Sequence, residues 1–346
     1  MKILIAASNM VHINNFHRPY IEEMRRRGNE VFIMASGEGA DFNVPFKKNA
    51  MSLKNLFLSR KIKKILKSGQ FDVVYLHTTL AAFWVRMAMK GMKKRPYVIN
   101  TVHGYLFGEG FSRLHNFVYL KCERLVRHQT DEILVMNDED FEIAKNNQLC
   151  KGNVTKIYGM GVRFPEKRII SEEKEDKSLR LVFVGEISKR KNQMLILRAL
   201  EKIPNASLTL VGDGDERENI LRYAKKHGLS DRLTITGFVK DVYPYIAEAS
   251  IYVSASYVEG LPFNILEAMH QGATIVASNV KGHRDLLPPE MLFTSGSENE
   301  LVQLLSTVSV EKRQYDVSKY SFESAFYDNM NKYMAFADER EMVKIM

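Results

Sequence analysis

Two glutamates eight positions apart, Glu259 and Glu267, are the residues whose types and spacing most clearly indicate chemistry in this 346-residue sequence. One carboxylate can accept hydrogen bonds from both hydroxyls of a ribose, and another can bind the hydroxyls of a sugar. Both belong to the run SASYVEGLPFNILEAMHQGATIVAS at residues 254–278. This run predicts a strand, a loop with Glu259, a helix over residues 263–271 that ends at Gly272, and a second strand. The pattern therefore predicts a site for a ligand rich in hydroxyl groups.

The start of the predicted helix adds groups that bind anions. Backbone N–H groups of a first helical turn have no partner within the helix and can donate to a phosphate or a sugar oxygen. The residues at this helix start are Gly260, Leu261, Pro262, Phe263 and Asn264. The alternative is a helix with ordinary acidic residues near its start and no ligand.

Three consecutive basic residues, Lys189, Arg190 and Lys191, lie between a predicted strand that ends at Gly185 and a predicted helix from Gln193. Positive groups close to a helix N-terminus favour anions, so this loop predicts a diphosphate site. Other units of strand, loop and helix also carry lysines without binding a ligand, and that alternative stays open.

A glycine-rich turn follows a later predicted strand. It consists of Gly212, Asp213 and Gly214, and glycines there allow the backbone to turn tightly beside a ligand. On its own, this turn is equally typical of an ordinary strand-to-helix connection.

The elements that must position these residues form two sets of alternating strands and helices. In the first half, strand-like runs lie at residues 2–7, 30–35, 71–77, 97–103 and 132–136. After a charged, turn-rich segment, the second set lies at residues 179–185, 207–212, 233–236, 251–254 and 274–277. Short apolar strands separated by helices predict parallel sheets with right-handed crossovers.

We therefore expect an α/β protein with two Rossmann-like, doubly wound domains that face a cleft. The expected domains are residues 1–165 and residues 166–320. An aromatic-rich helix at about residues 321–346 is expected to pack back on the first domain.

Composition narrows the class of protein. Apolar residues make up 45% of the chain, and the two cysteines, Cys122 and Cys150, exclude a disulfide framework or a cysteine-based metal cluster. We find no signal-peptide pattern and no apolar stretch of the roughly 18–20 residues that a membrane span needs. The expected compartment is the cytoplasm.

The net charge of +9 is unevenly distributed. Residues 1–165 carry 26 Lys and Arg against 14 Asp and Glu, whereas residues 166–346 carry 24 against 27. The basic excess clusters at Lys54, Arg60, Lys61, Lys63, Lys64, Lys67, Arg86, Lys90, Lys93, Lys94 and Arg95. We expect a surface that attracts anionic lipid, at the inner face of the cell membrane, with a solvated helix face as the alternative. Nucleic-acid binding is not expected, because interleaved aromatic residues and known modules are missing from these basic segments.

The spacing of Glu259 and Glu267 resembles the E-x7-E pattern of glycosyltransferase family 4, a retaining family with the GT-B fold. Other segments resemble family motifs in the same order along the chain. They are HINNFHRPY at residues 12–20, YLHTT at 75–79, INTVHGYLF at 99–107, the loop at 185–191, GDG at 212–214, GFVKDV at 237–242 and GHRDLL at 282–287. The first three resemble motifs of bacterial members that build capsular and extracellular polysaccharide.

The resemblance implies a role for each matching residue. Glu259 would contact the donor sugar, Glu267 the ribose, and Lys191 the diphosphate, for which Gly185 leaves room. Phe238 and Val239 would frame the base, and His103 would reach the donor sugar or its phosphate. Glu259, His103 and Lys191 are thus the implied catalytic residues. Retention would occur by front-face attack, with the leaving phosphate oxygen helping to remove the acceptor proton.

Two departures from the family pattern concern the phosphate loop and the first loop. Glu186 stands where many members have arginine, and a carboxylate beside a diphosphate is repulsive unless it turns away or basic neighbours compensate. Asn14 and Asn15 stand where a glycine pair often follows the first strand. Asparagine tolerates left-handed backbone conformations, and its side chain is expected to reshape the acceptor side.

Three further histidines, His12, His17 and His77, lie at or after strand ends of the first domain and are candidates for the acceptor side, with Asn14 and Asn15. We find no histidine or carboxylate spacing typical of a metal site. The resemblance likewise implies no divalent metal and no cofactor apart from the nucleotide sugar as co-substrate.

Together these features predict a retaining hexosyl- or N-acetylhexosaminyl-transferase that uses a nucleotide sugar, with uridine diphosphate favoured by the resemblance. The acceptor is expected to be linked to a polyprenyl diphosphate or to be a growing polysaccharide. Two alternatives are a nucleotide-sugar 2-epimerase of the same fold and a non-catalytic subunit that binds nucleotide sugar within a transferase complex.

Overall fold

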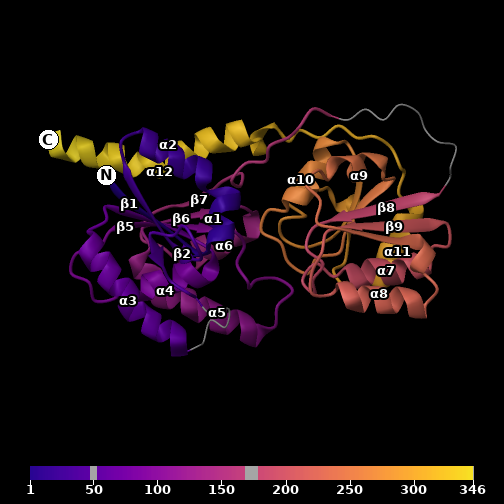
Figure 1. Cartoon of the computed structure of the whole chain (residues 1–346), viewed down its shortest axis with the longest axis horizontal. Helices are drawn as coiled ribbons and strands as arrows, with labels where there is room; N and C mark the ends of the chain where they lie inside the picture. Colours follow the sequence, from indigo (N-terminus) through magenta and orange to yellow (C-terminus); the bar gives the residue numbers. More distant parts are fainter. Residues whose placement is uncertain (47–52, 168–177, 346) are drawn as a thin grey trace. The chain divides into compact units, whose positions relative to one another are not determined.

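Short apolar runs form the strands of two parallel sheets, and the chain divides into two units accordingly. The computed structural model describes residues 1–46, 53–167 and 178–345, and of residues 53–56 and 336–345 it describes the backbone only. One unit consists of Met1–Gly161 with Phe322–Met346, and the other consists of Val162–Ser321 (Figure 1). Most of the predicted charged segment between the two sets of strands lies outside the described residues.

The sheet of the first unit has the strand order β3-β2-β1-β4-β5-β6-β7, and all its described pairings are parallel. Its strands are β1 (Lys2–Asn9), β2 (Glu30–Ser36), β3 (Phe42–Asn43), β4 (Val73–His77), β5 (Tyr97–Val102), β6 (Glu132–Val135) and β7 (Val154–Lys156). Its helices are α1 (Met10–Phe16), α2 (Arg18–Arg26), α3 (Leu53–Gly69), α4 (Thr79–Met89), α5 (Arg113–Val126), α6 (Asp138–Asn146) and α12 (Phe322–Ile345), with a short 3-10 helix at Arg127–Gln129.

The sheet of the second unit has the strand order β10-β9-β8-β11-β12-β13, again with parallel pairings. Its strands are β8 (Leu179–Val184), β9 (Ala206–Val211), β10 (Leu233–Gly237), β11 (Ile251–Ser254), β12 (Thr274–Ser278) and β13 (Leu292–Phe293). Its helices are α7 (Gln193–Glu201), α8 (Arg217–Lys226), α9 (Tyr243–Glu248), α10 (Phe263–His270) and α11 (Glu298–Thr307), with 3-10 helices at Ser230–Arg232, Pro289–Met291 and Ser318–Tyr320.

Both strand orders are those of a doubly wound sheet. The chain winds outward in one direction from β1 and from β8, and then in the other direction from β4 and from β11. In such sheets ligands bind beyond the carboxyl ends of the strands, where the winding direction reverses. The fold therefore places one candidate site after β1 and β4 and another after β8 and β11. The prediction of two doubly wound α/β sheets is confirmed.

Apolar side chains from strands and helices fill each unit. In the first unit, Leu4 and Leu76 of the sheet pack with Trp84 and Val85 of α4. In the second unit the core includes Phe183 and Leu210 of the sheet with Leu197 of α7. Burying each such side chain contributes roughly 1.5–3 kcal/mol, so these layers hold the loops at the strand ends in place.

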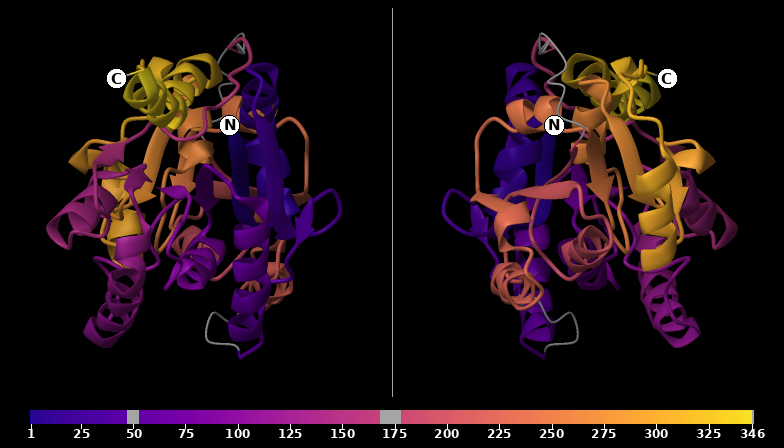
Figure 2. Two further views of the ribbon diagram at one scale, coloured as in Figure 1. Left: turned by 90° about the vertical axis from the view of Figure 1, so that its left-hand side faces the viewer. Right: turned by 90° about the vertical axis from the view of Figure 1, so that its right-hand side faces the viewer.

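The C-terminal helix α12 belongs to the first unit, although the whole second unit precedes it in sequence. Tyr75 of β4 donates from its hydroxyl to the backbone oxygen of Tyr333 at 2.5 Å. Asn329 of α12 donates from Nδ2 to the backbone oxygen of Gly159 at 2.7 Å and to the hydroxyl of Tyr20 at 3.1 Å. Both side views show α12 (yellow) close to the N-terminal helices (indigo) (Figure 2). The last helix thus completes the first unit.

One residue that was predicted to belong to the basic surface, Arg86, does not lie on the surface. Arg86 of α4 is fully buried and forms two hydrogen bonds with Glu123 of α5, at 3.0 Å and 3.1 Å. It also donates to the hydroxyl of Thr130 at 3.2 Å. Arginine is retained in this core because the Glu123 carboxylate neutralises it there.

Helix α3 carries much of the basic cluster that was expected to attract anionic lipid. Its residues Ile62 and Leu66 are buried in the core of the first unit, which leaves a basic outer face with Lys61, Lys64 and Lys67 exposed. The side chain of Lys54 lies outside the described residues. Among the described residues, no helix is long and apolar enough to cross a membrane.

Candidate active site

The side chain of Glu259 lies in the loop between β11 and α10, where the structure pairs it with two cations. Lys191 Nζ lies 2.6 Å from Glu259 Oε1, and Arg190 donates from a terminal nitrogen to Glu259 Oε2 at 3.3 Å. Glu259 and Lys191 are each only 8% exposed. Two opposite charges this deeply buried are tolerated because each neutralises the other.

The loop after β8 holds these cations at the end of the neighbouring strand. Gly185 turns the chain with a φ of +139°, and Asn192 adopts a left-handed conformation just before α7. Gln193 braces the loop, since its side chain donates to the backbone oxygen of Glu186 at 2.7 Å and accepts from the Ser188 N–H at 3.2 Å. A fold that reverses direction between β8 and β11 thus places Lys191 beside Glu259.

Two further bonds join the loops after β8 and β11. The Tyr257 N–H donates to the backbone oxygen of Arg190 at 2.9 Å. Asn264, in the first turn of α10, donates from Nδ2 to the backbone oxygen of Val184 at 2.8 Å. The predicted residues Gly185, Arg190, Lys191, Glu259 and Asn264 are therefore brought together at one place.

The electrostatic state of Glu259 follows from its partners. Burial by itself would raise the pKa of this carboxyl, but the charge of Lys191, with smaller contributions from His283 and Arg190, lowers the pKa to about 2. Glu259 is therefore ionised at neutral pH and Lys191 lies against a full negative charge.

Gly282 is needed to fit the chain beside this loop. Its φ is +82°, and an added Cβ would lie 2.7 Å from the backbone oxygen of Gly260 and 3.0 Å from the Cβ of Glu259. The neighbouring His283 is buried and forms hydrogen-bond contacts with Ser254 Oγ at 3.2 Å and the backbone oxygen of Ser278 at 2.8 Å. Sequence reasoning missed His283 as a support for the Glu259 loop.

Glu267 has the opposite electrostatic character. Burial raises the pKa of its carboxyl to about 7, and within the described part of the chain its carboxylate has no hydrogen-bond or ion-pair partner. The hydroxyls of Tyr243 and Tyr252 lie in the same environment, where burial and then the charge of Glu267 raise the pKa of both. A partly buried carboxyl without a partner is suited to bind the hydroxyls of a ligand, which would supply the missing hydrogen bonds.

Backbone packing explains the glycines of the turn at residues 212–214 without any ligand. Gly212 and Gly214 have φ angles of +150° and +158°. A Cβ on Gly212 would lie 2.0 Å from the backbone oxygen of Gly185, and one on Gly214 would lie 2.2 Å from that of Ile187. The turn therefore packs directly against the backbone of the basic loop and supports it.

The remaining predicted donor residues lie at the edges of this arrangement. Phe238 is 87% exposed and, with half-buried Val239, follows the edge strand β10. Lys189 is exposed, and so is the side chain of Glu186, whose backbone oxygen binds Gln193. Leu261 is half-buried, and Pro262 is buried directly before α10.

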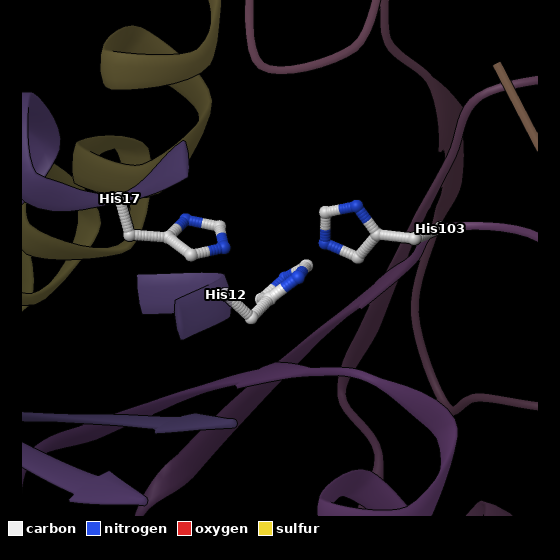
Figure 3. Close-up of side chains that lie close together, drawn as sticks. All are labelled: His12, His17 and His103. Atoms are coloured by element: carbon white, nitrogen blue, oxygen red, sulfur yellow. The ribbon is translucent and has the colours of Figure 1, made fainter. Parts of the chain in front are cut away.

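Four histidine rings converge in the first unit, at the carboxyl ends of its strands. His12 lies on α1 after β1, His17 directly precedes α2, His77 ends β4, and His103 follows β5. The His17 and His77 ring centroids are 3.8 Å apart and those of His12 and His103 are 4.7 Å apart. His77 Nδ1 lies 3.3 Å from His103 Nε2. The rings of His12, His17 and His103 surround a common point (Figure 3).

Burial determines the charge of these rings. It lowers the pKa of His12 to about 4 and the pKa of the other three well below the usual value, and neighbouring imidazoles lower these three further. The four rings are therefore neutral at neutral pH. Sequence reasoning treated the histidines one by one, although the order of the strands that precede them was the signal that would have grouped them.

Asn14 and Asn15 do not form the expected loop. Both lie within α1, because Asn9 caps this helix by accepting a hydrogen bond from the His12 N–H at 2.9 Å. Both side chains are exposed, and Asn14 accepts a hydrogen bond from Arg18 at 2.9 Å. The prediction that this pair fills a loop after the first strand is therefore wrong.

Comparisons with known proteins find family models that match both units of the chain. The family model "Glycosyl transferases group 1" matches residues 165–316, and the model "Glycosyltransferase Family 4" matches residues 20–158. The chain is 29% identical over 308 residues to the Bacillus subtilis protein named "Putative glycosyltransferase EpsD", covering 83% of this chain and 81% of that protein.

Two further proteins illustrate the range of relatives. The chain is 25% identical to the Escherichia coli UDP-Gal:alpha-D-GlcNAc-diphosphoundecaprenol alpha-1,3-galactosyltransferase, over 72% of this chain and 66% of that enzyme. The solved structure of the lipopolysaccharide outer core galactosyltransferase WaaB superposes with a TM-score of 0.70 at 18% identity, covering 97% of this chain and 99% of the other. The two family models, which between them span most of the sequence, and the shared GT-B fold lead to one conclusion: this chain is a glycosyltransferase that belongs to family 4.

Proposed function

We propose that the enzyme transfers a hexosyl or N-acetylhexosaminyl group, with retention, from a UDP-linked sugar to an acceptor linked to polyprenyl diphosphate or to a growing oligosaccharide, in the synthesis of a cell-surface polysaccharide. The observation that carries this proposal is the buried pair of Lys191 and Glu259 at the reversal point of the second sheet. The name of the E. coli relative states a UDP-galactose donor and a diphosphoundecaprenol-linked acceptor, which supports the proposed classes of donor and acceptor.

We assign the binding of the donor and of the acceptor to different units. Residues 166–320 would bind the donor, and residues 1–165 with the helix at about 321–346 would bind the acceptor. Within the first unit His103 would contact the donor sugar or its phosphate, and His12, His17 and His77 would lie on the acceptor side. Asn14 and Asn15, which are exposed on α1, would also lie on the acceptor side.

In the donor site the basic loop would offset the charge of the diphosphate. Lys191, Arg190 and Lys189 lie next to the N-terminus of α7, and their charge exceeds the single negative charge of Glu259 that pairs with two of them. Glu259 would accept hydrogen bonds from the donor sugar, and Lys191 holds its carboxylate in place. Glu267 would bind the ribose diol, and Phe238 and Val239 would lie along the base.

The reaction breaks the bond between the sugar C1 and the diphosphate oxygen and forms a bond between C1 and the acceptor oxygen on the same face. The proton of the acceptor hydroxyl passes to the leaving phosphate oxygen. Cations beside that oxygen stabilise the charge that develops on it, and such stabilisation is a large term in catalysis. The protein therefore contributes by neutralising the charge of the diphosphate and by positioning the donor and the acceptor.

A donor screen and one substitution test the proposal. Thermal shifts across nucleotide sugars identify the donor, because a bound donor stabilises the folded state. Glu259→Gln should then lower transfer at least about 100-fold while donor binding persists. Glu248→Gln, an exposed glutamate of the same unit, is the matched control and should retain transfer. Near-normal transfer by Glu259→Gln removes Glu259 from the mechanism, and donor turnover without any acceptor would indicate a 2-epimerase instead.

We also propose a cytoplasmic enzyme bound peripherally to the inner face of the cell membrane, through α5. Its residues Leu114, Phe117, Val118 and Leu125 are 43–74% exposed and follow helical spacing on one face. Lys121 lies in the same stripe, with its Nζ 5.3 Å from the Phe117 ring centroid. An exposed apolar stripe among basic residues suits an anionic lipid surface.

Vesicle flotation tests the membrane proposal. The protein should float with anionic vesicles more than with neutral vesicles, and less so at high salt. Phe117→Ser should weaken flotation, whereas Tyr327→Ser, which removes a 70% exposed ring on α12, should not. Equal flotation with both vesicle types would contradict the proposed binding to an anionic membrane.

A further inference from the structure

We propose that His12, His17 and His103 form a binding site for a transition-metal ion of the zinc class (Figure 3). One ring nitrogen from each of the three residues lies within 4.8 Å of the others. Zinc binds imidazole nitrogen at about 2.0–2.1 Å, so nitrogens around a tetrahedral ion stand roughly 3.4 Å apart. Rotations of the three side chains that shift each nitrogen by about 1 Å or less bring the ligands to this spacing.

Two of the ring nitrogens have no partner in the described part of the chain, although they are buried. They are Nε2 of His17 and Nε2 of His12, and His17 is only 1% exposed. Leaving a buried polar atom unpaired costs about 1–3 kcal/mol, and a group of facing imidazoles cannot satisfy all its nitrogens internally. A metal ion placed among them would use these lone pairs.

The scaffold holds the three ligands on separate, well-anchored elements. His12 lies in the first turn of α1, which Asn9 caps, and His17 directly precedes α2 with its backbone N–H bonded to Ile13 at 2.9 Å. His103 comes from the far side of the reversal point, after β5. Ligands from three segments define a site that exists only in the folded unit.

His77 would orient the ligands rather than bind the ion. Its ring lies against that of His17, tilted by 32° with a centroid distance of 3.8 Å, and its Nδ1 contacts His103 Nε2 at 3.3 Å. Such neighbouring contacts commonly fix the ring orientation of metal-binding histidines. His77 would thus help to fix the ring orientation of His17 and His103.

The ligand set selects the class of ion. Three neutral imidazoles without a carboxylate or a thiolate favour Zn²⁺, Co²⁺, Ni²⁺ or Cu²⁺ over Mg²⁺ or Ca²⁺. Three protein ligands leave a fourth position for water or an anionic oxygen. All ligands lie in the first unit, so the metal proposal does not depend on the donor chemistry of the second unit. His103 enters both proposals, and the metal test therefore uses no substrate.

Titration of the metal-free protein with zinc chloride, without an affinity tag, tests the site by calorimetry. We expect one equivalent of zinc per chain and, with Co²⁺ in its place, the visible absorption of a tetrahedral ion without a thiolate charge-transfer band. His17→Asn and His12→Asn should each weaken binding at least about 10-fold. His128→Asn, an exposed histidine of the same unit, should leave binding unchanged.

Each outcome has a defined meaning. The proposal is overturned if the wild type binds no stoichiometric zinc, or if both cluster variants bind as well as the wild type. A loss of binding in His128→Asn would assign the zinc to the surface and overturn the proposal too. Circular dichroism of each metal-free variant checks folding, and half-buried His12 provides the deciding variant if His17→Asn does not fold.

Discussion

The reversal points of the two sheets have the same backbone construction and different side-chain chemistry. Beyond β1 and β4 the fold gathers neutral imidazoles, with His12 and His77 among them, whereas beyond β8 and β11 it gathers the ionic residues Lys191 and Glu259. A doubly wound sheet therefore determines where a ligand can bind, and a few side chains determine which ligand binds. The charged point suits a diphosphate, and the neutral point suits an uncharged sugar or a metal ion.

Replacing Lys191 should disrupt the charged point most. Lys191→Met leaves the Glu259 carboxylate buried without its main partner, which should cost about 3–5 kcal/mol of unfolding free energy. Transfer should fall at least about 100-fold, because the proposed diphosphate contact is also lost. Chemical denaturation and initial rates measure the two effects.

The exposed neighbour Lys189 gives a matched control for stability. Lys189→Met should change the unfolding free energy by less than about 0.5 kcal/mol. The double variant Lys191→Met with Glu259→Gln should regain part of the stability, since no charge is then left unpaired. A Lys191→Met protein as stable as the wild type would show that the pair is not a buried ionic one.

Arg86 offers a buried ion pair of the first unit, on helices rather than at a strand end. Arg86→Met should also cost about 3–5 kcal/mol, because Glu123 is left buried without its partner. Donor binding by the folded protein should persist, since the proposed donor residues of the second unit are untouched. If Arg86→Met lost donor affinity while fully folded, the contrast between a purely structural pair and a functional pair would fail.

The two glutamates of the second unit should respond oppositely to pH. Glu267 has a pKa raised to about 7 by burial, from an ordinary value of 4.5, so it favours the folded state most below pH 4.5. This advantage is lost as the pH rises from 4.5 to 7. Relative to Glu267→Gln, the wild type should therefore lose about 1–3 kcal/mol of stability across that window.

Glu259 provides the contrasting titration. Its pKa is lowered to about 2, so its stabilising contribution is present above pH 4.5 and is lost as the pH falls toward 2. Unfolding free energies of Glu259→Gln and Glu267→Gln, measured from about pH 3 to about pH 8 and set against the wild type, compare the contributions of the two carboxyls. Parallel curves for the two variants would refute the opposite electrostatic assignment.

Arg190 should give the smallest effect. Its side chain is 42% exposed and its contact to Glu259 is the longer of the two, at 3.3 Å. Arg190→Ala should therefore change the unfolding free energy by about 1 kcal/mol or less, as is typical of an exposed ion pair. A loss as large as that of Lys191→Met would mean that both cations are needed to keep Glu259 buried.

The sequence predicted the local structure around Glu259 well. The Glu259 loop, the helix from Phe263 and the turn at Gly272 follow from apolar periodicity, a proline before the helix and a glycine after it. These features depend on residues that are neighbours in the chain. For the same reason the alternating strands and helices were predictable.

Contacts between distant residues were not predicted, because they depend on which strands become neighbours in the folded sheet. Lys191 and Glu259 are 68 residues apart, and nothing in either segment shows that β8 and β11 are neighbours. Arg86 looked like a surface residue because its partner, Glu123, is 37 residues away. The histidine cluster likewise depends on strand order, which joins positions 12, 17, 77 and 103 only after folding.

The return of α12 to the first unit has a consequence for synthesis on the ribosome. Residues 162–321, which form the whole second unit, emerge before the helix that supplies Asn329 and Tyr333 to the first unit. Domains of a growing chain generally fold in order from the N-terminus. Here the order is reversed, because the second unit has all its residues while the first still waits for its last helix. Until then Tyr20 and Tyr75 lack the α12 groups that bond to them, and the nascent chain must remain soluble with that surface uncovered.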